Sequence, residues 1–140
     1  MHDYQTQNFG AVKEEVADKK VILVVDDELG WRELLSSELS LEGYAVISAD
    51  CALAALDLLG RNRVDVIVTD VRMPGKMDGI DLINTYCPQG KVPPRVVYMT
   101  GYASEEKLLD ALERHKPSHC FKKPFDVADL IKVISSIFNQ

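Results

Sequence analysis

The chain has 140 residues, the length of one compact domain, and its 46% hydrophobic and 27% charged residues are typical of a soluble globular protein. A formal net charge of −6 argues against direct binding to nucleic acid or anionic membranes, because phosphates must be met by clustered Lys and Arg. No apolar run approaches the ~20 residues that cross a bilayer, and the N-terminus lacks the apolar core of a signal peptide. We therefore expect no membrane contact and a cytoplasmic location.

The cysteines form neither a disulfide framework nor a zinc motif. They are three in number and widely separated, at Cys51, Cys87 and Cys120. We interpret them as buried free thiols in a reducing compartment.

The chain begins with a polar stretch of mixed charge, which we interpret as a flexible extension over residues 1–19, so that the folded domain covers residues 20–140. The run Val21 to Val25 follows, and its unbroken apolar character predicts a strand buried on both faces. Similar strands are expected at 64–69 and 95–100, with shorter ones at 44–49 and 118–122.

Helical patterns separate these strands. Apolar residues at three-to-four spacing predict helices around Trp31 to Leu39 and over residues 52–59, 79–86 and 104–114. A fifth helix, near the C-terminus, has the clearest apolar stripe, and Asp126 is placed to cap its start. The residues of that stripe are Val127, Leu130, Ile131, Ile134 and Ile137.

Five strands alternating with five helices predict an α/β fold with parallel, right-handed crossovers. We expect a doubly wound five-stranded parallel sheet of order 2-1-3-4-5, the flavodoxin-like arrangement. Ligands of such sheets bind beyond the carboxyl ends of the strands, where the strand order reverses.

Four of the five expected strands end in polar or charged residues. The groups are Asp26-Asp27, Asp70, Thr100-Gly101 and Lys123-Pro124, in chain order. The expected strand order would bring all four to one rim of the sheet.

Three carboxylates at one rim would repel one another unless a cation compensates them. Oxygen ligands in a partly open site suit Mg²⁺. The three histidines have no ligand spacing with Cys or carboxylates, so we do not expect a transition metal.

The same groups fit phosphoryl transfer, which needs an in-line nucleophile, a metal, a cation and donors to the phosphoryl oxygens. Asp70 would be the nucleophile, and Mg²⁺ and Lys123 would each meet one phosphoryl oxygen. The Thr100 hydroxyl or the Gly101 backbone N–H would meet the third.

Each group alone has a more common explanation: an Asp pair as a turn or cap, a pre-proline Lys as a surface residue, and a strand-end Thr as a backbone partner. Their ordered combination favours the catalytic interpretation.

Five segments in this order strongly resemble response-regulator receiver domains over about residues 20 to 138. They are Val24-Val25-Asp26-Asp27-Glu28, Asp70-Val71-Arg72-Met73-Pro74, Met77-Asp78-Gly79, Met99-Thr100-Gly101-Tyr102 and Phe121-Lys122-Lys123-Pro124-Phe125.

The resemblance implies that Asp70 is phosphorylated and that Lys123 pairs with the phosphoryl group. It implies that Asp27, Asp70 and the Arg72 backbone carbonyl ligate Mg²⁺, with Asp26 acting largely through water. It further implies that Thr100 moves toward the phosphoryl group, and that the Lys123-Pro124 bond is cis.

By the same resemblance, the phosphoryl group comes from a sensor histidine kinase or phosphotransfer protein, and the modified surface acts on a downstream effector protein. We expect a single-domain receiver that catalyses only its own phosphorylation and dephosphorylation and is not otherwise an enzyme. Dimerisation stays open.

The chain has two alternative interpretations. One is a receiver-like interaction module that works without phosphorylation, which the complete set of Asp, Thr and Lys disfavours. The other is a phosphohydrolase or nucleotide-binding domain; the chain lacks a second Asp two residues beyond Asp70 and a Gly-rich loop after the first strand.

The chain departs from the family pattern at Cys120, where an aromatic residue is usual, and at Gly75-Lys76, which lengthen the loop after Asp70 by one position. We expect a modified output route. Arg72 and Tyr102 flank the expected path of a hydrolytic water, so we also expect slow dephosphorylation.

Overall fold

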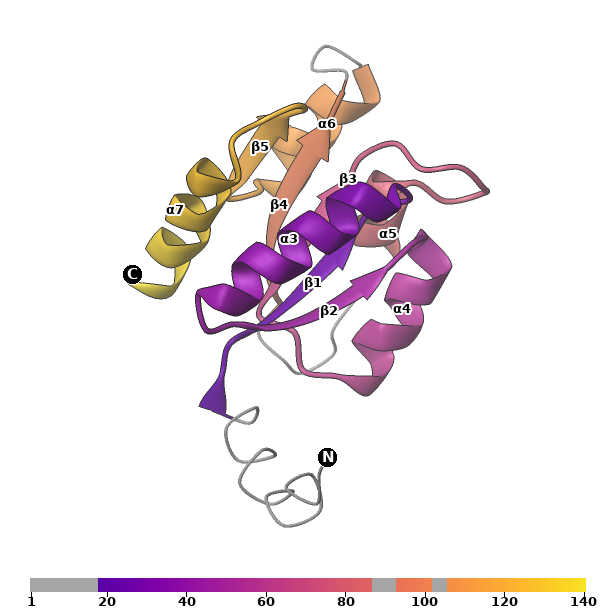
Figure 1. Cartoon of the computed structure of the whole chain (residues 1–140). Coiled ribbons are helices and arrows are strands. Elements are labelled where there is room, and N and C mark those ends of the chain that lie inside the picture. The colour runs from indigo at the N-terminus through magenta and orange to yellow at the C-terminus, as the bar shows by residue number, and fades with distance from the viewer. Residues whose placement is uncertain (1–17, 87–92, 102–105) are drawn as a thin grey trace.

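The computed structural model describes residues 18–86, 93–101 and 106–140, so the predicted N-terminal extension lies almost wholly outside the described residues. Strands and helices alternate along the chain, as Figure 1 shows. They are β1 Val21–Val25, α3 Leu29–Leu41, β2 Ala45–Ala49, α4 Ala52–Arg61, β3 Val66–Asp70, α5 Gly79–Thr85, β4 Arg95–Thr100, α6 Glu106–His115, β5 His119–Lys122 and α7 Val127–Phe138.

The strands form one parallel sheet in the order β2-β1-β3-β4-β5, which confirms the predicted doubly wound architecture. The strand order reverses at β1, which lies between β2 and β3. The carboxyl ends of β1 and β3 are therefore neighbours, although 45 positions separate Val25 from Asp70 in the sequence.

Helices cover both faces of the sheet. Figure 1 shows α3 and α7 together on one face, with α4, α5 and α6 on the other. Alternate residues of β1 serve the two layers: Ile22 and Val24 pack with α3 and α7, whereas Leu23 and Val25 pack with α4. A strand buried on both faces needs apolar residues at every position, which explains the unbroken run that marked it in the sequence.

Element boundaries differ from the predictions by one or two residues. Strand β3 begins at Val66 rather than at residue 64, because Asp65 is hydrogen-bonded to the first residue of β1. The Asp65 N–H donates to the Val21 carbonyl (2.8 Å), and the Asp65 carboxylate accepts from the Val21 N–H (2.7 Å). The strand also continues through Asp70, which pairs with Met99. The start predicted at Ser104 lies outside the described residues.

Within the part of the chain that the structure describes, side chains cap the starts of α4, α5 and α7. Asp126 accepts a hydrogen bond from the Ala128 N–H, as predicted, and Asp78 and Asp81 form a reciprocal capping box at α5. Cys51 caps α4 through its sulfur. Among the described residues, none of the helices has both the length and the apolar character needed to cross a lipid bilayer.

The cysteine prediction was correct about free thiols and wrong about their burial. Cys51 and Cys120 are both free but only partly buried. Cys51 lies at a helix start and Cys120 on the edge strand β5, where covering layers are incomplete. Cys87 lies outside the described residues.

Gly79 brings the start of α5 against the end of β3. Its N–H donates to the Val71 carbonyl at 2.9 Å, and a Cβ built on Gly79 would lie 1.9 Å from the Asp70 carbonyl oxygen. Only a residue without a side chain permits this approach.

Replacement of Gly79 by Ala should therefore lower the free energy of unfolding by about 2–3 kcal/mol, because backbone atoms must move apart to admit the methyl group. Gly60→Ala is the matched control, since nothing lies within 4 Å of a Cβ there, and we expect it to be neutral or stabilising by up to ~1 kcal/mol. Urea unfolding of the two variants measures both effects. Equal stabilities would contradict the importance of this contact.

Candidate functional site

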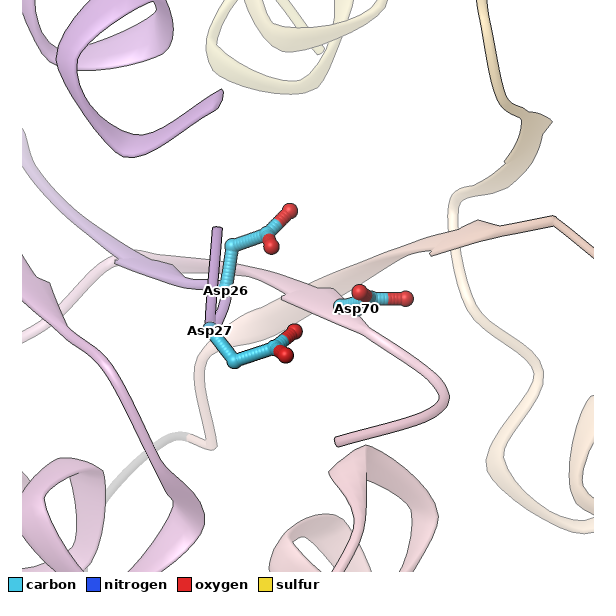
Figure 2. Close-up of side chains that lie close together, drawn as sticks. All are labelled: Asp26, Asp27 and Asp70. Atoms are coloured by element: carbon cyan, nitrogen blue, oxygen red, sulfur yellow. The ribbon is translucent and has the colours of Figure 1, made fainter. Parts of the chain in front are cut away.

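The predicted rim is present at the carboxyl ends of the strands. Figure 2 shows Asp26 and Asp27 just beyond β1 and Asp70 at the end of β3, with their carboxylates extending to the same side of the view. One oxygen from each carboxylate lies within 4.8 Å of the others. Asp26 and Asp70 are buried, whereas Asp27 is exposed.

Lys123 supplies the positive charge at the centre of this group. Its ammonium nitrogen lies 2.6 Å from Oδ2 of Asp26 and 3.1 Å from Oδ2 of Asp70, so one ammonium bridges the ends of β1 and β3. The Lys123 N–H also donates to the Thr100 carbonyl at 2.7 Å, and the Lys123-Pro124 bond is cis as expected. The side chain of Lys123 is only 11% exposed.

Burial lowers the affinity of Lys123 for its proton, but its carboxylate partners have the larger combined effect. The hydrogen bond to Asp26 and the charges of Asp70 and Asp26 raise the pKa of Lys123 above its ordinary value. The bridging group is therefore a stable ammonium.

The environment of Asp70 disfavours the charged form of its carboxylate. Burial raises the pKa of Asp70 from 3.8 to about 6, and the Asp26 charge adds to this, although Lys123 and a backbone hydrogen bond from Arg72 act in the opposite direction. The structure thus leaves Asp70 with a carboxylate that is poorly compensated by protein groups alone.

Asp26 is held more firmly. Its Oδ1 accepts from the Glu28 N–H at 2.9 Å, and its backbone carbonyl accepts from Nη1 of Arg32 at 2.8 Å. These bonds fix a carboxylate that is completely buried.

The remaining predicted residues border the same hollow. A cavity of about 450 Å³ beside Asp70 is lined by Asp27, Arg72, Gly101 and Lys123 among others. Thr100 is buried directly before Gly101 at the end of β4. All the residues predicted from the strand ends therefore lie at one rim, next to a space large enough for a small anion.

The donor set fits Mg²⁺. Three carboxylates face one ammonium, which leaves a local excess of negative charge, and all the side chains in the acidic group offer oxygen. Burial, and to a smaller extent the Asp26 charge, raises the pKa of Asp70, and a divalent cation would favour its charged form. Of the described residues, only Asp26, Asp27 and Asp70 form a group of this kind that could hold a metal ion.

Comparison with known proteins identifies the architecture. The family model described as the response regulator receiver domain matches residues 22–135, which is most of the chain. The chain belongs to the response regulator receiver domain family. It is accordingly a phosphoacceptor module of two-component signalling.

Relatives of the receiver domain differ in overall length. Sporulation initiation phosphotransferase F of Bacillus subtilis is 36% identical over 112 residues, which cover 78% of this chain and 86% of that protein. Response regulator protein FleR of Pseudomonas aeruginosa is 34% identical over 81% of this chain, but the match covers only 24% of FleR.

Solved structures agree with this assignment. A CheY-like receiver domain protein of Methanospirillum hungatei superimposes with a TM-score of 0.77 at 25% identity, over 87% of this chain and 95% of that one. The response regulator protein TrrA of Thermotoga maritima, solved in complex with Mg²⁺ and BeF, gives a TM-score of 0.70 at 28% identity, over 84% and 97% of the two chains.

Two neighbours of Lys123 were not predicted from the sequence as site residues. Glu28 lies 3.5 Å from the ammonium, and the indole ring of Trp31 lies 5.0 Å from it. Glu28 directly follows the Asp pair and Trp31 stands four residues beyond Asp27, so proximity along the start of α3 was the available signal.

The structure also describes the two departures from the family pattern. Cys120 pairs in register with Tyr98 of β4, and both belong to the cluster under α6, so an aromatic ring reaches this region from the neighbouring strand. Burial raises the pKa of the Cys120 thiol, as expected for an unreactive side chain.

In the lengthened loop after Asp70, Gly75 has φ +102° and Lys76 is exposed. Tyr102 lies outside the described residues.

The raised pKa of Asp70 makes a prediction about stability without metal. The folded protein keeps this proton up to about pH 6, whereas the unfolded chain loses it near 3.8, so stability should fall as the pH rises between these values. Asp70→Asn removes this loss. In the presence of a chelator at pH 7, it should raise the free energy of unfolding by about 2–3 kcal/mol.

The difference should shrink toward zero below pH 3.8, where the Asp70 carboxyl is protonated in both the folded and the unfolded state. Urea unfolding across this pH range measures it. Asp50→Asn, at an exposed position, is the control and should change stability by less than about 0.5 kcal/mol. If the Asp70→Asn protein were no more stable than the wild type at pH 7, the charged Asp70 carboxylate would not destabilise the folded protein.

Proposed function

We propose that Asp70 is the phosphoacceptor of this receiver domain. The observation that carries the proposal is the bridging ammonium of Lys123, within 3.1 Å of Asp70 and 2.6 Å of Asp26, beside an open cavity. A carboxylate can attack phosphorus when nearby cations neutralise the charge of the incoming group. Asp70 combines this position with access from the cavity.

Asp26, Asp27 and Asp70 would hold Mg²⁺ together with the backbone carbonyl of Arg72, with Asp26 bound largely through water. The bound ion would neutralise charge on the phosphoryl oxygens. Support comes from the excess of negative charge in the acidic group and its oxygen-only ligands.

The other residues would act on the phosphoryl group once it is attached. Lys123 would exchange its contact with Asp26 for one with a phosphoryl oxygen, and the Thr100 hydroxyl would move toward another. Phosphorylation adds roughly −1.5 to −2 charges at the rim. This added charge would shift Thr100 and the neighbouring surface to the signalling arrangement.

The donor would be a sensor histidine kinase or phosphotransfer protein, and the receiver would act on a downstream effector protein, or through dimerisation, in the cytoplasm. The receiver domain would occupy residues 20–140. Its chemistry would be limited to its own phosphorylation and dephosphorylation, without direct contact with nucleic acid or membranes.

Labelling with a small phosphodonor tests the acceptor. Incubation with acetyl phosphate and Mg²⁺ should add one phosphoryl group to the wild type and to Asp50→Asn, but none to Asp70→Asn, as read by intact mass. Chelation of the metal should abolish the addition, because the phosphoryl charge would then lack compensation.

An unlabelled wild type would overturn the proposal and favour an interaction module that works without phosphorylation. Multiple turnovers of a small phosphoester would instead revive the phosphohydrolase. Persistent labelling of Asp70→Asn would move the acceptor to another residue.

Arg72 should also lengthen the lifetime of the phosphorylated form. Its exposed side chain lines the cavity beside Asp70, where it would obstruct a hydrolytic water. Arg72→Ala should shorten the half-life about threefold, equivalent to ~0.6 kcal/mol in the barrier. Arg72→Lys keeps bulk and charge and should stay near the wild type. An unchanged half-life in Arg72→Ala, followed by intact mass after removal of the donor, would contradict steric shielding.

A further inference from the structure

The ammonium of Lys123 has an aromatic neighbour in addition to its carboxylates. The nitrogen lies 5.0 Å from the centroid of the Trp31 ring, within the range of about 6 Å in which a cation is attracted to an aromatic face. Because the side chain of Lys123 is largely buried, this attraction is weakly screened by water. Trp31 therefore adds an uncharged contact to an ammonium otherwise surrounded by oxygens.

The Trp31 ring is held by the residues that flank Lys123. It stacks on Phe125 with centroids 4.9 Å apart, and Phe125 stacks on Phe121 at 4.8 Å. Phe121 and Phe125 lie two residues before and two residues after Lys123 in the chain. The three stacked rings thus join α3 to the segment that carries the ammonium.

This arrangement limits where the ammonium can go. Asp26 attracts it at 2.6 Å, Asp70 at 3.1 Å and the exposed Glu28 at 3.5 Å, so carboxylates alone offer competing positions. An ion pair with an exposed group such as Glu28 contributes little. In the structure, the ammonium lies within hydrogen-bonding distance of both Asp26 and Asp70 while it contacts the aromatic face, so the cation–π contact favours this position.

We propose that Trp31 is a positioning residue for phosphoryl transfer, which holds the ammonium of Lys123 beside Asp70 through a cation–π contact. The inference rests on the proposed roles of Asp70 and Lys123. It adds a residue of α3 to a site otherwise built from strand ends.

The sequence contains a single tryptophan, which allows a test that preserves the shape of the side chain. Fluorinated tryptophans incorporated during expression would replace Trp31 alone, and each fluorine withdraws electron density from the ring face. The rate of self-phosphorylation by acetyl phosphate should fall stepwise from tryptophan through its mono-, di- and trifluorinated forms, to a total loss of about 3–10-fold. A purely structural role for the ring predicts no graded response.

A double-mutant cycle provides the second measurement. Trp31→Leu should slow labelling about 3–10-fold, whereas Trp31→Phe, which keeps an aromatic face, should lose less. In the Lys123→Met background, Trp31→Leu should cause no further loss, because the ammonium is already absent. A small donor is essential, since it removes any contribution of Trp31 to docking of a protein donor.

The outcomes separate the two proposals. An unlabelled wild type would overturn the proposed function and this inference together. Normal labelling with rates unaffected by fluorination, or an equal loss from Trp31→Leu with and without Lys123, would overturn the inference alone.

Discussion

The ammonium of Lys123 lies between two buried carboxylates that the sheet holds within a few ångströms of each other. Without this charge, Asp26 and Asp70 would face one another in a poorly solvated rim, where like charges are costly. Even with it, burial keeps the pKa of Asp70 near 6. The site therefore holds more negative than positive charge, and this excess explains why it suits a divalent cation.

The fold creates this excess through strand order. β1 and β3 are adjacent although β2 lies between them in sequence, so the residues that follow them meet where the order reverses. The close approach of Gly79 to the Asp70 carbonyl then anchors α5 beneath the loop that leaves β3. Hydrophobic packing on both faces of the sheet holds the strands in place. This packing offsets the electrostatic repulsion between carboxylates that lie close together.

The two sides of the sheet contribute differently to the site. On the α3 and α7 side, Trp31, Phe125 and Phe121 form a stack that reaches the Lys123 ammonium. On the α6 side, Tyr98 is buried beside Cys120, with its hydroxyl 2.6 Å from Nδ1 of His115. This side has Cys120 on β5 and the aromatic ring of Tyr98 on the adjacent strand β4, and both pack beneath α6.

The sequence by itself determined the alternation of strands and helices, the parallel sheet and the polar residues at its rim, because periodicity and strand-end chemistry are local properties. Only the tertiary structure decided that Asp70 is buried with a raised pKa, that one ammonium bridges Asp26 and Asp70, and that Trp31 lies over it. It also shortened β3 at Asp65, whose hydrogen bonds go to β1. These features depend on distances between residues far apart in the chain, and such distances are set by packing rather than by sequence spacing.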